Sequence, residues 1–267
     1  MYKADYHMHT ALSIDCKASI DSQIEAAIKK GFSEIAITDH FEYDLIEDKW
    51  ALTLDLPSYI DTIRTYQEKY KDRICIKRGV EVGFETRYKR QIETLLKDKT
   101  FDFIICSTHK CDMQELALGG FFIGKEQKKA YTAYFDHVLD TLRNFDNFDV
   151  YGHLDYVNRY GKYPVKVLTS MDYREQIGEI LQILINKGKG LEVNTSGIRY
   201  GLGHFNPQIP VLRRYLELGG EIITIGSDSH CNEHVGFLWE EAARMLKNIG
   251  FKYYATFENR KPILKLL

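Results

Sequence analysis

Short stretches rich in β-branched and aromatic residues alternate with helical patterns along the chain, and this alternation limits the possible folds more than any other feature. In the helical patterns, apolar residues recur three or four positions apart, as one face of a helix requires. Parallel strands need a crossover between them, usually a helix, so the alternation predicts a parallel sheet. The strand-like stretches are 4–9, 34–40, 74–81, 101–109, 148–153, 190–196 and 221–227.

Helices are expected in the intervals between these stretches. Ser22 and Glu25 have the spacing of a capping box, which predicts a helix that starts at Ser22 and is ended by Gly31. Pro57 is typical of the first turn of a helix, and the pattern after it extends to about Tyr70. Further helices are expected over 126–145, about 177–184, 211–218 and 238–248.

A chain of 267 residues has the usual length of a single α/β barrel. We therefore expect one barrel domain, 1–267, and a doubly wound open sheet is the competing arrangement. Apolar residues make up 44% of the chain, enough for a large core, and the 28% of charged residues argue against disorder.

Charge and cysteine content bear on partners and location. The net charge of −2 gives no indication of a nucleic-acid or membrane partner, and no apolar run reaches the roughly 20 residues of a membrane span. The sequence reaches His7 without a signal-peptide pattern. Five cysteines without zinc-knuckle spacing are typical of free thiols, so a cytoplasmic protein is expected; the oligomeric state is left open.

Polar residues gather where the strand-like stretches end. Residues two apart on a strand point to the same side, so His7 and His9 can share one direction, as can Asp228 and His230. Six of the nine histidines fall at these ends, a concentration that chance placement does not explain. A closed barrel brings the ends of its strands around one mouth, where active sites of such barrels lie. The polar residues are His7, His9, Asp39, His40, Glu81, His109, His153, Asp155, Asn194, Asp228 and His230.

Imidazole and carboxylate groups together suit Zn²⁺, Fe²⁺ or Mn²⁺, and so many of them exceed the needs of one ion. Two ions about 3.5–4 Å apart can clamp a transferring phosphoryl group and lower the pKa of a bound water. The sequence has neither a G-x-S-x-G elbow nor a P-loop, which fits such chemistry. These features predict a metal-dependent phosphatase.

Six ordered motifs occur along the chain: His7-Met8-His9-Thr10, Thr38-Asp39-His40, Gly79-Val80-Glu81, Ser107-Thr108-His109, Gly152-His153-Leu154-Asp155 and Gly226-Ser227-Asp228-Ser229-His230. Together they resemble the motifs of the polymerase and histidinol phosphatase (PHP) superfamily, over nearly the whole chain. The segment 257–262 also resembles the ending of the monofunctional histidinol-phosphate phosphatases within it.

The resemblance implies a distorted seven-stranded TIM-like barrel with two or three divalent metal ions, Zn, Mn or Fe. The first ion would be bound by His7, His9, Glu81 and Asp228. The second ion would share Glu81 with the first and would also be bound by His109 and His153. Some relatives have a histidine after the first motif that binds the third ion; this chain has none there, and Asp15 is expected to replace it beside His40 and His230.

The resemblance also implies the reaction, hydrolysis of L-histidinol phosphate to L-histidinol and phosphate in histidine biosynthesis, through a hydroxide that bridges two metals. One alternative is a PHP-type phosphoesterase that acts on nucleotides or phosphotyrosine, and a second is a non-catalytic metal-binding module. Expected catalytic residues are His109, Asp155 and Asp228. Expected substrate-binding residues are Arg159, Arg199, Glu115, His40 and His230.

Overall fold

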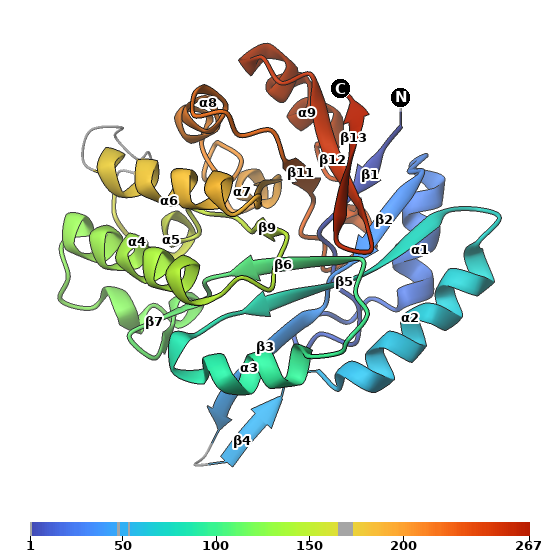
Figure 1. Ribbon diagram of the computed structural model, residues 1–267, viewed down its shortest axis with the longest axis horizontal. Helices are drawn as coiled ribbons and strands as arrows, with labels where there is room; N and C mark the ends of the chain where they lie inside the picture. The colour runs from blue at the N-terminus through green and yellow to red at the C-terminus, as the bar shows by residue number, and fades with distance from the viewer. Residues whose placement is uncertain (1, 47–48, 53, 165–172) are drawn as a thin grey trace.

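The structure, a computed structural model, describes residues 2–46, 49–52, 54–164 and 173–267 (Figure 1). Within these ranges, a parallel sheet contains neighbouring strands that are joined by helical crossovers. In spatial order, the strands are β1 (Ala4–Asp5), β2 (Glu34–Ile37), β5 (Cys75–Gly83), β6 (Phe103–Ser107), β9 (Val150–Tyr151), β10 (Gly190–Asn194) and β11 (Ile223–Gly226).

The two edges of this sheet meet where the segment after β1 runs beside β11 and the residues that follow it. The Tyr6 N–H donates to the Ile225 carbonyl at 3.0 Å, and the His9 N–H donates to the Ser229 carbonyl at 2.8 Å. These bonds continue the parallel pairing, so the sheet closes on itself. The predicted barrel of seven parallel strands is confirmed, and the open doubly wound sheet is excluded.

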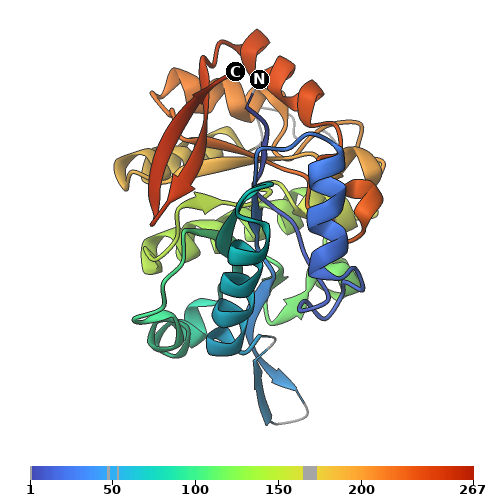
Figure 2. The same ribbon diagram turned by 90° about the vertical axis from the view of Figure 1, so that its right-hand side faces the viewer.

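An extra strand follows β2 after a two-residue break and was not predicted. This strand, β3 (His40–Ile46), runs parallel to β5 and places His40 directly opposite Glu81. It then forms an antiparallel hairpin with β4 (Lys49–Leu52), which projects from the barrel at the bottom of Figure 2. After the break the chain pairs with β5 again, and this pairing places His40 beside Glu81 at the same end of the barrel.

Helices surround the barrel (Figures 1 and 2). The predicted capping box at Ser22 is wrong, because Ser19 is the N-cap and its hydroxyl accepts the Ser22 N–H at 3.2 Å. The helix near Pro57 is confirmed. The helices are α1 (Ile20–Lys29), α2 (Leu56–Tyr70), α3 (Lys89–Leu96), α4 (Gln127–Asn144), α5 (Val157–Tyr160), α6 (Arg174–Asn186), α7 (Ser196–Arg199), α8 (Ile209–Glu217) and α9 (Trp239–Ile249), with 3-10 turns η1 (Thr86–Tyr88), η2 (Leu116–Leu118), η3 (Gly120–Phe122) and η4 (Asn232–His234).

A C-terminal hairpin covers the end of the barrel where the strands begin. It consists of β12 (Tyr253–Glu258) and β13 (Lys261–Leu266), and the ring of Phe257 lies 4.9 Å from that of Phe103, the first residue of β6. Arg260 in its turn donates to the side chain of Asp149, just before β9. This end is filled by side chains, which leaves the opposite end, where the strands finish, for a site. A smaller hairpin, β7 (Lys110–Cys111) and β8 (Gln114–Glu115), lies at that other end.

The buried apolar side chains form one continuous core inside and around the barrel. Among the described helices, none combines the length and the apolar composition that crossing a membrane requires.

Candidate metal centre

The strand ends bring the predicted ligands to one end of the barrel. His7 and His9 follow β1, and His153 follows β9. Apart from Asp15, the other predicted ligands lie on or just after four further strands, β3, β5, β6 and β11. Several of these side chains line a cavity of about 60 Å³. Its lining residues are Asp15, His40, Glu81, His109, His153, Tyr156, Arg159, Tyr160, Tyr200, Asp228 and His230.

A first group of possible ligands consists of two imidazoles and two carboxylates. The Nε2 atoms of His7 and His9 lie 3.1 Å apart, and Glu81 Oε2 lies 3.2 Å and 3.5 Å from them. Asp228 Oδ1 lies 3.4 Å from His9 Nε2 and 3.8 Å from His7 Nε2. Ligands about 2 Å from a tetrahedral ion are about 3.3 Å from one another, so these four atoms fit one zinc-like ion.

The tautomer of His7 supports this interpretation. Its Nδ1 donates to Glu192 Oε1 at 2.6 Å, so Nε2 is the nitrogen that faces the first group and could bind an ion. Glu81 Oε2 is buried and lies 2.9 Å from His40 Nδ1, in addition to its contacts with the Nε2 atoms of His7 and His9. A buried carboxylate oxygen surrounded by imidazole nitrogens is an arrangement that fits a bound metal.

Glu81 connects the first group to a second. Its other oxygen, Oε1, lies 3.3 Å from His109 Nε2 and 3.0 Å from His153 Nε2, and it accepts a hydrogen bond from Ser107 Oγ at 2.6 Å. The ligand atoms of Glu81, His109 and His153 lie within 4.8 Å of one another. A carboxylate with one oxygen toward each group is the arrangement that a bridging ligand of two ions requires.

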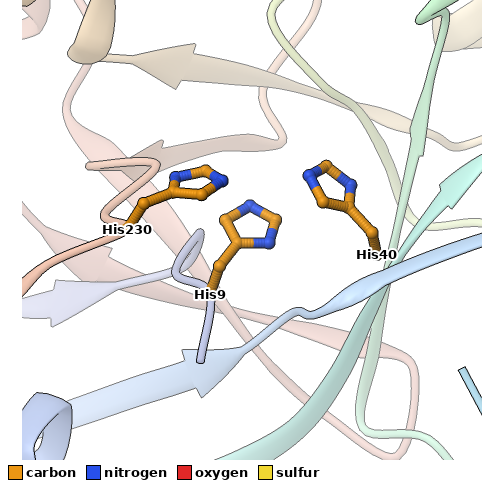
Figure 3. A group of neighbouring side chains, drawn as sticks. All are labelled: His9, His40 and His230. Atoms are coloured by element: carbon orange, nitrogen blue, oxygen red, sulfur yellow. The ribbon is translucent and has the colours of Figure 1, made fainter. Parts of the chain in front are cut away.

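A third group contains two histidines that flank His9, as Figure 3 shows. The rings of His40 and His230 each lie 4.2 Å from that of His9. Asp15 Oδ2 lies 3.4 Å from His40 Nε2 and 3.0 Å from His230 Nε2. Asp15 therefore lies beside His40 and His230, as expected from the sequence, and its carboxylate is half exposed.

Sequence reasoning missed two glutamates that bind candidate ligand histidines. Glu192 on β10 binds His7 through one oxygen and accepts the His153 backbone N–H at 2.8 Å through the other. Glu42 on β3 accepts from His109 Nδ1 at 2.6 Å. Such carboxylate–histidine pairs fix the ring orientation of metal ligands. Strand periodicity could have found both, because each glutamate lies two residues from a polar residue noted at a strand end, Asn194 or His40, and residues two apart point to the same side.

Gly226, the last residue of β11, permits the close approach of β1 and β11 at the first group. A Cβ atom at this position would lie 2.4 Å from His7 Cβ and 2.4 Å from Glu192 Oε1. Both distances are far below van der Waals contact, so any larger residue would displace His7 or the carboxylate that orients it.

Burial and neighbouring charges both shift the pKa values of the side chains in the site. Burial alone would raise the pKa values of Glu81 and Asp228, but nearby imidazoles, first among them His7, hold both well below the usual range. Burial, with His230 and His40 close by, lowers the pKa of His9 well below 6.5. Two ionised carboxylates and a neutral imidazole are therefore ready to bind a cation at neutral pH.

Arg159, on α5, reaches the cavity from the side. Its guanidinium donates to Ser196 Oγ, lies 3.4 Å from Asp228 Oδ2 and stacks 3.9 Å from the ring of Tyr200. Its buried Nε has no hydrogen-bond partner in the described part of the chain. A buried cation with an unused donor at a cavity wall suits an anionic ligand.

Besides His7 and His9, which belong to the first ligand group, three predicted residues lie outside the lining of this cavity. Arg199 donates to the Ser227 and Asp228 carbonyls, each at 2.8 Å, and thus faces the backbone that carries Asp228. Asp155 is fully buried, and its carboxylate accepts hydrogen bonds from Asn158, Asn206 and the Gln208 N–H, so it joins the loops after β9 and β10. Glu115, on β8, is half-buried and belongs to the hairpin after His109.

Comparisons with known proteins agree with this geometry. The family model of the PHP domain matches residues 5–196. The histidinol-phosphatase of Lactococcus lactis is 34% identical over 98% of this chain and 96% of its own length. A crystal structure of histidinol phosphate phosphatase from the same organism, in complex with zinc, L-histidinol and phosphate, superposes with a TM-score of 0.88 at 33% identity and covers 98% of both chains.

A second solved structure, from Listeria monocytogenes, has a TM-score of 0.74 at 19% identity and covers 90% of this chain and 99% of its own, which supports the fold alone. The matched model spans more than half of the chain and contains five of the six motifs. The chain therefore belongs to the PHP domain family.

Proposed function

We propose that this protein is a metal-dependent histidinol-phosphatase, which hydrolyses L-histidinol phosphate to L-histidinol and phosphate in histidine biosynthesis. The observation that carries the proposal is the convergence of three ligand groups on Glu81, Asp228 and His9, next to a buried arginine. The Lactococcus lactis relative, similar over nearly the whole chain, supports the choice of substrate.

The ligand assignment follows the three groups. His7, His9, Glu81 and Asp228 would hold the first ion, and Glu81 would share the second with His109 and His153. Asp15, His40 and His230 would hold the third. Zinc, manganese and iron suit these nitrogen and oxygen donors, and the bound zinc of the Lactococcus lactis structure supports the first of these metals.

When bound, such ions supply positive charge for the phosphoryl oxygens and a water of lowered pKa as the nucleophile. The protein's own contribution is orientation: Glu192 and Glu42 fix the rings of His7 and His109, and Glu81 faces both groups at once. His109 and Asp228 are proposed as catalytic residues because both line the cavity in which the reacting phosphate would lie. Asp155 supports the loop that bears Arg159.

Arg159 is proposed to bind the phosphate through its unused Nε–H and to neutralise part of the negative charge that develops in the reaction. His40 and His230, at the cavity wall, are proposed to contact the same group. A phosphate contact by Arg199 would require it to give up at least one of its two carbonyl bonds. Glu115 is proposed to attract the cationic amine of the substrate.

The cavity accommodates only the phosphoryl end of the substrate. A second cavity of about 610 Å³ shares Arg159 and Tyr160 with the first. The leaving group of a small phosphate monoester therefore has room next to the metal centre, beyond Tyr160. This arrangement supports a small-molecule substrate. We also propose a cytoplasmic location, which the five free cysteines support.

The test is phosphate release from L-histidinol phosphate, a dinucleotide and a phosphotyrosine peptide, with zinc present. Histidinol phosphate should be hydrolysed fastest, and a faster rate on either other substrate would contradict the proposal. His109→Ala should abolish turnover, whereas His137→Ala, which alters a histidine on α4 outside the metal centre, should leave it unchanged. A protein that binds zinc and hydrolyses none of these esters would instead be a non-catalytic metal-binding module.

A further inference from the structure

Asp5, the last residue of β1, is a buried carboxylate beside the metal centre that is not itself one of its ligands. Its side chain has no exposed surface. Burial of a carboxylate costs several kcal/mol unless hydrogen-bond donors replace the lost water. The donors that surround Asp5 therefore indicate what this costly group does.

Three segments provide those donors. The Ser227 N–H donates to Oδ1 at 2.9 Å and the Ser227 hydroxyl to Oδ2 at 2.6 Å. The Gly236 N–H, ahead of α9, donates to Oδ2 at 2.8 Å, and the His7 N–H approaches Oδ1 at 3.4 Å. Asp5 thus connects His7, a possible ligand of the first ion, to Ser227, the residue just before Asp228.

Such support matters at Asp228 because its backbone adopts an uncommon conformation. Its φ is +53°, in the left-handed region that residues other than glycine rarely adopt. Its N–H donates to the His7 carbonyl at 2.7 Å, and this bond places its carboxylate beside His9. A small rotation of the backbone at Ser227 would turn Asp228 away from the histidines.

We infer that Asp5 is a positioning residue, whose carboxylate fixes His7 and Asp228 relative to each other so that both reach the same ion. The inference rests on the proposed metal site and not on the choice of substrate. In Asp5→Asn the new amide N–H₂ faces a backbone N–H, from either Ser227 or Gly236, so at least one of these bonds is lost.

A matched control separates this role from a general contribution to folding. Asp149 is also a buried aspartate that accepts a backbone N–H, from Ile104 at 2.7 Å, and a side-chain bond from Arg260. It precedes β9, at the end of the barrel where the strands begin, and His153 lies after β9 at the other end. Asp149→Asn removes a comparable carboxylate without touching the metal centre.

The experiment is competition for zinc between the zinc-loaded protein and a chromophoric chelator, with folding followed by circular dichroism. Asp5→Asn should weaken the tightest zinc site by about 10–100-fold, as loss of support for metal ligands does. Ser227→Ala, which removes only the hydroxyl donor, should weaken it by about tenfold. Asp149→Asn should bind zinc like the wild type, and excess zinc should restore phosphate release by Asp5→Asn.

Zinc binding by Asp5→Asn equal to that of the wild type would overturn the inference, and so would an equal loss in Asp149→Asn. If Asp5→Asn does not fold, wild-type affinity in Ser227→Ala would overturn it as well. Wild-type protein that binds zinc but releases no phosphate from L-histidinol phosphate would refute the proposed function and leave this inference standing.

Discussion

Replacing Glu192 by glutamine tests how the barrel prepares its histidines for metal binding. Glu192 accepts a bond from Asn194 Nδ2 at 3.2 Å and makes two bonds that serve different ligand groups, one to the ring of His7 at 2.6 Å and one to the backbone N–H of His153 at 2.8 Å. Glutamine has the same shape but only one acceptor oxygen in its amide. If that oxygen faces His7, the N–H₂ opposes the His153 N–H, and if the amide flips, the Nδ1–H of His7 loses its acceptor.

The expected loss follows from these two bonds. A hydrogen bond to a charged group contributes about 1.5–3 kcal/mol, and about 1.4 kcal/mol corresponds to a tenfold change in an equilibrium constant. Loss of one such bond therefore predicts zinc binding weakened by about 10–100-fold. Because Glu192 supports both His7 and His153, more than one bound ion should be affected.

The assay is zinc competition against a chromophoric chelator, with phosphate release from L-histidinol phosphate measured at limiting and at excess zinc. Glu34→Gln is the control, because Glu34 is also a buried glutamate and is hydrogen-bonded to Tyr2 and Tyr6 at the other end of the barrel. A zinc affinity of Glu192→Gln within about twofold of the wild type would refute the reasoning, since the bonds would then contribute nothing to metal binding.

Three further predictions follow. Gly226→Ala should reduce zinc affinity and phosphate release by at least about tenfold in a folded protein, since its Cβ would lie 2.4 Å from His7 Cβ; unchanged affinity in a chelator competition would contradict the close approach. Arg159→Lys should raise KM for L-histidinol phosphate by about tenfold or more with zinc affinity unchanged, because lysine lacks the forked donors; steady-state kinetics would show an unaltered KM if the arginine does not bind phosphate. Burial alone would lower the pKa of His109, but Glu81 and Glu42 raise it to about 10, above the unfolded value of about 6.5. His109 therefore carries a proton at pH 7 until zinc displaces it, so zinc affinity should fall as pH is lowered, and calorimetry in buffers of different ionisation enthalpy should detect proton release.

The parallel barrel and the ligands at its strand ends were predictable because each depends on local pattern. Alternating strands and helices allow few topologies, and a closed parallel sheet brings its strand ends together whatever lies between them. His9 and Asp228, far apart in sequence, could be placed side by side for this reason alone.

Side-chain direction on the loops was not predictable in the same way. Arg159 and Arg199 both follow strand ends, yet one guanidinium faces the cavity and the other binds backbone carbonyls, because the partners that each finds depend on packing between loops. Asp155 similarly follows its strand as a ligand would, but it is enclosed by amide donors from another loop. The N-terminus of α1 was predicted wrongly at the local level. Either Ser19 or Ser22 could be its N-cap, and only the backbone geometry shows that Ser19 is the N-cap.

Zinc titration of chelator-treated protein, with phosphate release from L-histidinol phosphate as the signal, tests most directly whether the clustered histidines and carboxylates form a metal-dependent active site. Activity should be close to zero without metal and should rise to a plateau at two or three zinc ions per chain. Full activity in protein shown by elemental analysis to contain no metal would contradict it.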